Sequence, residues 1–405
     1  LDVVARFFRY LGYEVKLVSN FTDIDDKIIN RAEAEGTTET EIAERYIKEI
    51  LETYKKLNCM PHYRNPKVTE TIPEIIDFIK LLIEKDAAYV AEGDVYFDVS
   101  KVKDYGILSG QNQENLMVGA RIAENELKKN PTDFNLWKKT TVGKKWDSPW
   151  GEGRPGWHTE CVVMANNILG GKIDIHGGGL ELKFPHHDNE IAQAEIAFGH
   201  HLANYWMHNG RVDLDGEKMS KSLGNVIMAH ELVEEIGYGV YRLMILNVPY
   251  RQPLNYKEEL IKQSETDYEK IKRSFISLYR KLQLDYQITD YQVEIKNEEL
   301  VNLKQEFIKA LSDDFNTANG LTVIYKLVKI INNLTRMRNP EVSNMKESLK
   351  LLNEFLWVFG IDFPLNPLNE EELELVKRWQ EARKNKNFEL ADSLRDEVYE
   401  RGIIL

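Results

Sequence analysis

The chain has 405 residues, 29% charged and 42% hydrophobic, which is typical of a soluble globular protein with about two to four domains. No run of about 18 apolar residues occurs, which excludes a transmembrane helix, and two cysteines cannot build a disulfide framework, which favours a reducing cytoplasm. The net charge of −13 argues against a nucleic-acid partner for the surface as a whole, although basic residues cluster at 138–145 and 383–386.

The N-terminal segment predicts a helix, a strand and a polar loop in that order. Residues 1–8 already have the pattern of an amphipathic helix and the chain starts with Leu1, so we expect native sequence to precede it. A short strand is predicted over 14–18, and it leads into the polar segment 20–26. Ligands bind at such carboxyl ends of strands in doubly wound sheets. Thr38 and Glu41 predict a capping box at the start of the next helix.

The middle of the chain changes character twice. Pro73 begins a predicted helix, and residues 89–97 predict a β-hairpin. The polar, turn-rich segment 101–156 is interpreted as an insertion packed on the main sheet. Strand and helix then alternate over 157–208, with a strand at 173–175.

The remainder is predicted to be helical. Residues 257–360 predict a helical bundle, Pro364 and Pro367 mark a linker, and a final helical pair follows. The chain as a whole therefore predicts an α/β protein with a Rossmann-like, doubly wound parallel sheet and an inserted subdomain, followed by α-helical domains.

A lysine- and serine-rich segment, Lys218-Met219-Ser220-Lys221-Ser222, has the residues to bind a polyphosphate. Two ammonium groups three positions apart can reach the same phosphates, and flanking glycines let such a loop close as pyrophosphate leaves. The alternative is a solvated basic turn.

A glycine run at the end of a predicted strand indicates a nucleotide site. His176 and Gly177, Gly178 and Gly179 leave backbone open to a flat ring or a ribose, and Glu181 can accept hydrogen bonds from ribose hydroxyls. The alternative is a tight turn between a strand and a helix.

His186 and Glu190 lie four residues apart on a predicted helix, which places imidazole and carboxylate on one face. Cys161 could add a thiolate, and this set suits Zn²⁺. The alternatives are a satisfied polar helix face and a buried free cysteine. Cys59 is a possible fourth ligand, but its place at the end of an apolar helix favours packing. The acids near Thr22 could bind a metal or an amine, although capping is the commoner role.

Several motifs in order resemble cysteinyl-tRNA synthetase, a class I aminoacyl-tRNA synthetase, and the resemblance runs through the whole chain. They are the segments 20–27, 153–161, 176–179, 184–190 and 218–222, with 312–317 and 382–403 similar to the family's helical bundle and anticodon-binding end.

The resemblance implies an enzyme that joins L-cysteine to tRNA(Cys) through cysteinyl-adenylate. It implies Zn²⁺ on Cys161, His186 and Glu190, with the substrate thiolate in the open position, and ATP with Mg²⁺ as substrate. Trp157 and Thr22 would contact cysteine; Lys221 with Lys218 would stabilise the phosphates. The nucleotide would be held by His176, Gly177, Gly178, Gly179 and Glu181.

The family's Cys-Gly-Pro-Thr-like and His-Ile-Gly-His segments do not occur in these residues, so the first zinc ligand and half of the ATP site are expected upstream. The alternatives are a ligase that transfers cysteine to a small amine and a non-catalytic tRNA- or metal-binding relative. We expect a cytoplasmic monomer without membrane contact. The expected domains are the first half of the catalytic domain (1–62), a connective insertion (63–150), the second catalytic half (151–210), a stem-contact region (211–262), the bundle (263–362) and an anticodon-binding region (363–405).

Overall fold

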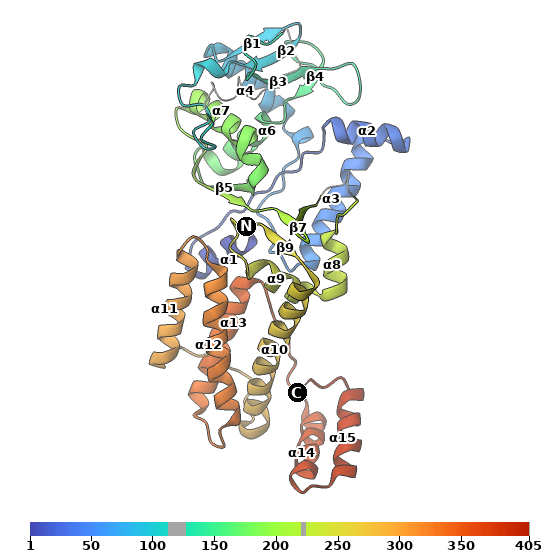
Figure 1. Ribbon diagram of the computed structural model, residues 1–405, viewed down its shortest axis with the longest axis vertical. Coiled ribbons are helices and arrows are strands. Elements are labelled where there is room, and N and C mark those ends of the chain that lie inside the picture. Colours follow the sequence, from blue (N-terminus) through green and yellow to red (C-terminus); the bar gives the residue numbers. More distant parts are fainter. Residues whose placement is uncertain (112–126, 220–223, 405) are drawn as a thin grey trace.

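The computed structural model describes residues 1–111, 127–219 and 224–404. The molecule is long, with the strands in the upper half, a helical bundle below them, and a separate helical pair at the C-terminal end (Figure 1). None of the described helices combines the length and apolar character needed to cross a bilayer.

Four α-helices precede the first strand, and the first of them packs against the bundle core through Phe7. The capping box is confirmed, because Thr38 and Glu41 each accept a hydrogen bond from the other's backbone N–H. The helix that contains Pro73 is also confirmed, with proline in its first turn, where no intrahelical donor is lost. These helices are α1 (Asp2–Tyr10), α2 (Asp26–Glu35), α3 (Glu39–Lys56) and α4 (Ile72–Glu84).

The predicted strand over 14–18 is wrong. The segment is extended but forms only isolated bridges, Val18 with Arg64 and Phe21 with Lys67. Its neighbour along this edge includes Pro61 and Pro66, which have no N–H to donate, so a regular ladder cannot form. Backbone bonds such as Phe21 N to Pro66 O, 2.8 Å, still hold the segment in place.

Residues 88–155 contain an antiparallel sheet in the order β1-β2-β3-β4. The predicted hairpin is confirmed, and its turn residues Glu92 and Gly93 both have positive φ, as a two-residue hairpin turn requires. Its large buried side chains include Tyr96, Phe97 and Trp137. The strands are β1 (Ala88–Ala91), β2 (Asp94–Phe97), β3 (Phe134–Lys139) and β4 (Gly153–Pro155).

The strand–helix alternation after residue 157 is confirmed. Strands β5 and β6 are parallel, and α7 makes the crossover between them. The glycine run was expected to follow a strand, but Gly177 to Gly179 lie inside β5 and pair with Met207 to Asn209 of β6. The elements are α6 (Thr159–Ala165), β5 (Ile173–Gly179), a π-helical segment (Lys183–His187), α7 (Asp188–Phe198) and β6 (Ala203–Asn209).

A small three-stranded sheet and two helices connect the two halves of the molecule. An Asp215-Gly216 turn with positive φ at both residues joins β7 to β8, and β9 pairs with β7 in parallel. The elements are β7 (Val212–Leu214), β8 (Glu217–Lys218), α8 (Ala229–Ile236), α9 (Tyr238–Leu246) and β9 (Leu254–Tyr256).

The predicted bundle and final helical pair are confirmed. Phe307 and Phe355 stack at 4.0 Å between ring centroids in the bundle core, whereas the last two helices enclose a small core of their own around Val376 and Leu394. The helices are α10 (Glu258–Tyr286), α11 (Glu298–Ser312), α12 (Thr317–Arg336), α13 (Val342–Phe359), α14 (Glu370–Lys384) and α15 (Phe388–Glu400).

Candidate active site

The three candidate metal ligands converge although they come from three elements. Cys161 lies on α6, His186 in the π-helical segment and Glu190 in the first turn of α7. Cys161 Sγ lies 3.6 Å from His186 Nε2, and that nitrogen lies 3.0 Å from Glu190 Oε1. All three ligand atoms fall within 4.8 Å of one another, which is the spacing that a single ion requires.

Glu190 provides a test of whether these residues fit a cation. Its side chain is fully buried, and within the described chain neither carboxylate oxygen receives a hydrogen bond of acceptable geometry. His176 Nε2 and His186 Nε2 approach to 3.0 Å without the required alignment. Burial raises the pKa of Glu190, but the two imidazoles outweigh this and lower it, so the carboxylate stays ionised. A buried carboxylate without aligned donors favours a bound cation, and sulfur, nitrogen and oxygen donors fit Zn²⁺.

His176 lies against the metal cluster as well as on the glycine strand. Together with His187 and Glu190 it forms a second group whose ligand atoms fall within 4.8 Å. Its ring contacts Trp206 edge-on, with 4.8 Å between ring centroids. The sequence interpretation assigned His176 to the nucleotide alone, whereas its imidazole faces Glu190.

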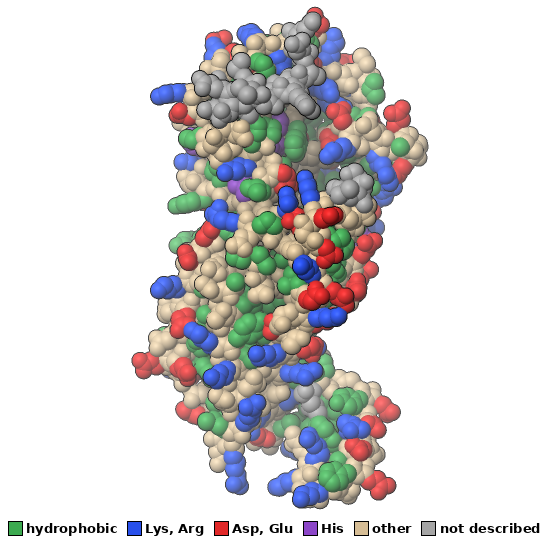
Figure 2. Space-filling view, viewed as in Figure 1, with side chains coloured by type: hydrophobic (Ala, Val, Ile, Leu, Met, Phe, Trp, Pro, Cys, Tyr) green, Lys and Arg blue, Asp and Glu red, His purple; other side chains and the backbone are tan. Residues whose placement is uncertain are grey.

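Three further histidines complete the cluster, and the sequence interpretation missed them. His158 Nδ1 lies 2.9 Å from His186 Nδ1, and His187 Nδ1 lies 2.8 Å from His208 Nε2. Burial lowers the pKa of His158 and of His187 to about 3, so both rings are neutral. The signal was present: seven of the chain's nine histidines lie in the range 158–208. Histidine side chains are visible in a recess of the upper half in Figure 2.

The predicted cysteine contacts lie beside this cluster. Trp157 is half exposed, and its ring centroid is 4.4 Å from that of His186. Thr22 donates to Glu160 Oε1 at 3.2 Å, and Asn20 donates to Cys161 Sγ at 3.7 Å, which ties the polar loop 20–26 to α6. Asn20 and Glu160 were not predicted, because nothing in their spacing links the loop to α6.

A cleft of about 290 Å³ opens next to Trp157. It lies between the start of α2, strands β3 and β4, and the start of α6. Burial raises the pKa of Glu160, which lines it, well above its ordinary value. The other polar residues that line it are Asp25, Asp26, Lys128, Asn135, Lys138, Arg154 and His158.

The glycine run exposes backbone next to Glu181. A Cβ on Gly179 would overlap the Glu181 carboxylate, and one on Gly178 would lie 2.9 Å from Leu182 Cδ1. Glu181 lies in a 3₁₀ turn directly after β5, so the structure brings Gly177, Gly178, Gly179 and Glu181 together. A side chain at either glycine would force these neighbouring side chains to move.

The lysine- and serine-rich segment begins at β8. Lys218 is exposed, and its backbone lies opposite that of Asp213 in the antiparallel β7–β8 ladder. The side chain of Asn255 accepts a hydrogen bond from Gly216 N at 2.8 Å. Gly216 and Gly224, on either side of the segment, both have positive φ. Ser220, Lys221 and Ser222 lie outside the described residues.

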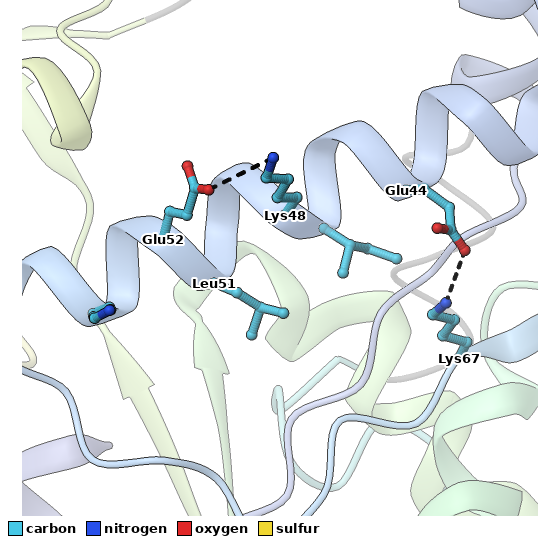
Figure 3. Close-up of a pocket in the computed structure, with 7 residues that line it drawn as sticks. Glu44, Lys48, Leu51, Glu52 and Lys67 are labelled. Carbon is cyan, nitrogen blue, oxygen red and sulfur yellow. Dashed lines mark hydrogen bonds and ion pairs between the residues drawn. The ribbon is translucent and has the colours of Figure 1, made fainter.

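A second cleft, on α3, shares no residue with the cysteine and histidine cluster (Figure 3). Lys67 Nζ lies 3.2 Å from Glu44, and Lys48 Nζ lies 4.0 Å from Glu52, so two of the three lysines that line this cleft are paired with carboxylates.

Comparisons with known proteins agree with this architecture. Residues 1–266 match the family model described as "tRNA synthetases class I (C) catalytic domain", and residues 306–364 match the DALR domain. The chain is 44% identical over 409 residues to a cysteine–tRNA ligase of Geobacillus sp. and over 408 residues to one of Streptococcus agalactiae. Each alignment covers 100% of this chain and 87% of the relative.

A solved structure shows the same fold at low sequence identity. It is the Mycobacterium tuberculosis methionyl-tRNA synthetase in complex with methionyl-adenylate, with a TM-score of 0.65 and 14% identity. The match covers 88% of this chain and 85% of that one, so it supports the class I synthetase fold and nothing finer.

Proposed function

The chain belongs to the cysteine–tRNA ligase family of class I synthetases, and from this premise we propose that it charges tRNA(Cys) with L-cysteine through cysteinyl-adenylate. In the first step a carboxylate oxygen of cysteine attacks the α-phosphorus of ATP, and the bond to the β-phosphate breaks to release pyrophosphate. In the second step a terminal ribose hydroxyl of tRNA attacks the activated carbonyl carbon. AMP leaves with the bonding electrons, and the hydroxyl proton passes to the released phosphate.

Cysteine recognition rests on the convergence of Cys161, His186 and Glu190, the observation that supports this proposal most strongly. These residues would hold Zn²⁺, which binds a substrate thiolate far better than a serine hydroxyl. Trp157 would form one wall of the amino-acid site, and Thr22 would orient the substrate by hydrogen bonding. The neutral imidazoles of His158 and His187 hold neighbouring side chains without adding charge.

ATP with Mg²⁺ would bind along β5 and be activated from the loop after β8. The backbone of Gly177 to Gly179 would contact adenosine, Glu181 would accept from the ribose, and His176 would bridge this site and Glu190. Lys218 and Lys221 would stabilise the charge that develops as pyrophosphate leaves.

The helical half would carry tRNA. Figure 2 shows basic and acidic side chains interspersed over the bundle and the final helical pair, so tRNA would contact local basic clusters such as 383–386 and not this face as a whole. We retain the six expected domains as proposed divisions, with 211–262 contacting the stem and 363–405 reading the anticodon. We further propose a cytoplasmic monomer.

The other functions considered from the sequence are not favoured. A ligase for a small amine has no use for an anticodon-reading region, and a purely binding relative has no use for a metal cluster beside a nucleotide strand. Identity of 44% to curated cysteine–tRNA ligases along the whole chain supports the ligase instead.

The test is cysteine-dependent exchange of labelled pyrophosphate into ATP by the full-length protein, followed by charging of tRNA(Cys). Exchange should require cysteine, and serine should be at least about 10³-fold poorer, because the proposed site discriminates by ligand chemistry. Equal exchange with serine would contradict the selection mechanism, and charging of another tRNA in preference would contradict the function.

A further inference from the structure

The acidic residues around the cleft beside Trp157 differ in their burial and in the partners of their carboxyl groups. Asp23 accepts from Thr69 N at 3.0 Å and from the Thr69 hydroxyl, and Asp25 caps α2 by accepting from Ile28 N at 2.8 Å. Asp26 forms ion pairs with Arg154 and with Lys138 Nζ, the latter at 3.3 Å. Each of these carboxylates already has a structural partner.

Glu160 is the most buried of these side chains, and its one donor among the described residues is neutral. Its side chain is only 2% exposed, yet it forms no ion pair with any basic side chain in the described part of the chain. Its one hydrogen bond there is the Thr22 hydroxyl at 3.2 Å. Burial with one neutral donor disfavours the charged form of Glu160 in the free protein, and a cationic ligand would compensate that charge.

The position of Glu160 identifies which cation would reach it. Glu160 lines the cleft together with Trp157, and it precedes Cys161 in the first turns of α6. Thr22, which donates to Glu160, is a proposed substrate contact. A ligand with its sulfur near Cys161 would therefore place a group on its Cα near Glu160 and Thr22. In cysteine that group is the ammonium.

We propose that Glu160, oriented by Thr22, binds the α-ammonium group of the substrate cysteine. The inference rests on the proposed function and deepens it, because it assigns the recognition of the amine separately from that of the thiol. Burial strengthens the ion pair that the ammonium forms with Glu160, and an analogue without the amine cannot form it.

The experiment measures binding with the zinc-loaded, full-length protein by calorimetric titration. The probes are cysteine and 3-mercaptopropionate, which has the thiol and the carboxylate but no amine. The wild-type protein should prefer cysteine by about 10²-fold. In Glu160→Gln, which keeps an acceptor for Thr22, the preference should fall to less than about fivefold while zinc content is unchanged.

Asp26→Asn is the matched control, because it removes a carboxylate of the same cleft whose charge is already paired. It should keep the wild-type preference. If Glu160→Gln does not fold, Glu160→Asp takes its place. Its shorter side chain should weaken cysteine binding by about tenfold without changing that of 3-mercaptopropionate.

Three outcomes overturn the inference. One is wild-type preference in Glu160→Gln, another is equal weakening of both ligands, and the third is unchanged cysteine affinity in Glu160→Asp. Failure of the proposed function has a different signature, because the wild-type protein would then show no cysteine-dependent pyrophosphate exchange.

Discussion

The Nε2 atom of His176 lies 3.0 Å from Oε2 of Glu190, so the glycine strand and the candidate metal ligands meet at one carboxylate. His186 Nε2 approaches the other oxygen at the same distance. Because His176 belongs to β5 and Glu190 to α7, the parallel β5–α7–β6 unit itself sets this contact. The proposed nucleotide side and the proposed amino-acid side of the site therefore share one structural element.

Removing this contact should weaken metal binding. In His176→Gln the orientation of Glu190 is lost, so zinc affinity should fall by about 10- to 100-fold in a chelator competition assay. His201→Gln is a suitable control. His201 Nε2 lies 3.9 Å from Glu195, which belongs to the same helix as Glu190, and both side chains lie at the surface. Unchanged zinc affinity in His176→Gln would show that Glu190 is held without it.

The lysines around β8 should act on the transition state and not on substrate affinity. Lys218→Ala and Lys221→Ala should each lower the kcat of pyrophosphate exchange by about 10²-fold, with little change in the KM for cysteine. Lys262→Ala, which removes an exposed lysine paired with Glu258 on α10, should leave both constants unchanged. A rise in KM alone would mean that the lysines only bind substrate.

Gly156 sets the position of Trp157. A Cβ at this residue would overlap the carbonyl oxygen of Asn135 on β3, and Gly156 N donates to Leu136 O at 2.8 Å. Gly156→Ala should therefore force β3 and the segment after β4 apart, at a cost of about 1–3 kcal/mol in stability. We expect a lower thermal midpoint together with a raised KM for cysteine. An unchanged midpoint would contradict the close approach.

The junction between the two halves should respond to acid. Asp2 accepts from Arg242 Nη2 at 2.5 Å and from Arg6 Nε at 2.9 Å. Burial raises the pKa of Asp2, but the two guanidiniums and the Met60 backbone N–H outweigh it and lower the pKa. Because the pKa of Asp2 is lower in the folded state, its ionised carboxylate stabilises the protein at pH values above the unfolded-state pKa of about 3.9. This stabilisation is lost as the pH falls through the folded-state pKa.

Asp2→Asn should accordingly lower the thermal midpoint at pH 7, and the difference from the wild-type protein should shrink below about pH 4, where the wild-type carboxylate is also neutralised. Glu258→Gln, an exposed partner of Lys262, should change the midpoint little at either pH. A difference for Asp2→Asn that is constant from pH 7 to pH 3 would exclude an electrostatic origin.

Local features of the fold were predictable from the sequence, because nearby residues determine them. The Thr38–Glu41 capping box and the 89–97 hairpin depend on residues a few positions apart. The strand predicted over 14–18 failed because its outcome depends on a distant neighbour interrupted by Pro66. The i, i+4 pair His186 and Glu190 was likewise visible in the sequence.

The contacts of the site that join separate elements were not predictable. The side chain of His176 turns to Glu190 only because α7 packs beside β5, and no spacing encodes that choice. Glu160 and Thr22 are 138 positions apart, so their hydrogen bond follows from tertiary packing alone. The family resemblance supplied roles for single residues but not these connections.

The most direct test of the account compares the two cysteines. Cys161 is proposed to bind Zn²⁺, whereas Cys59 lies beside Arg242, whose Nη1 is 3.9 Å from its Sγ. Zinc per protein and cysteine-dependent pyrophosphate exchange are measured for Cys161→Ser and Cys59→Ser in the full-length protein. The account predicts that Cys161→Ser loses both together and that Cys59→Ser keeps both. Exchange at the wild-type rate in a zinc-depleted Cys161→Ser protein would contradict it.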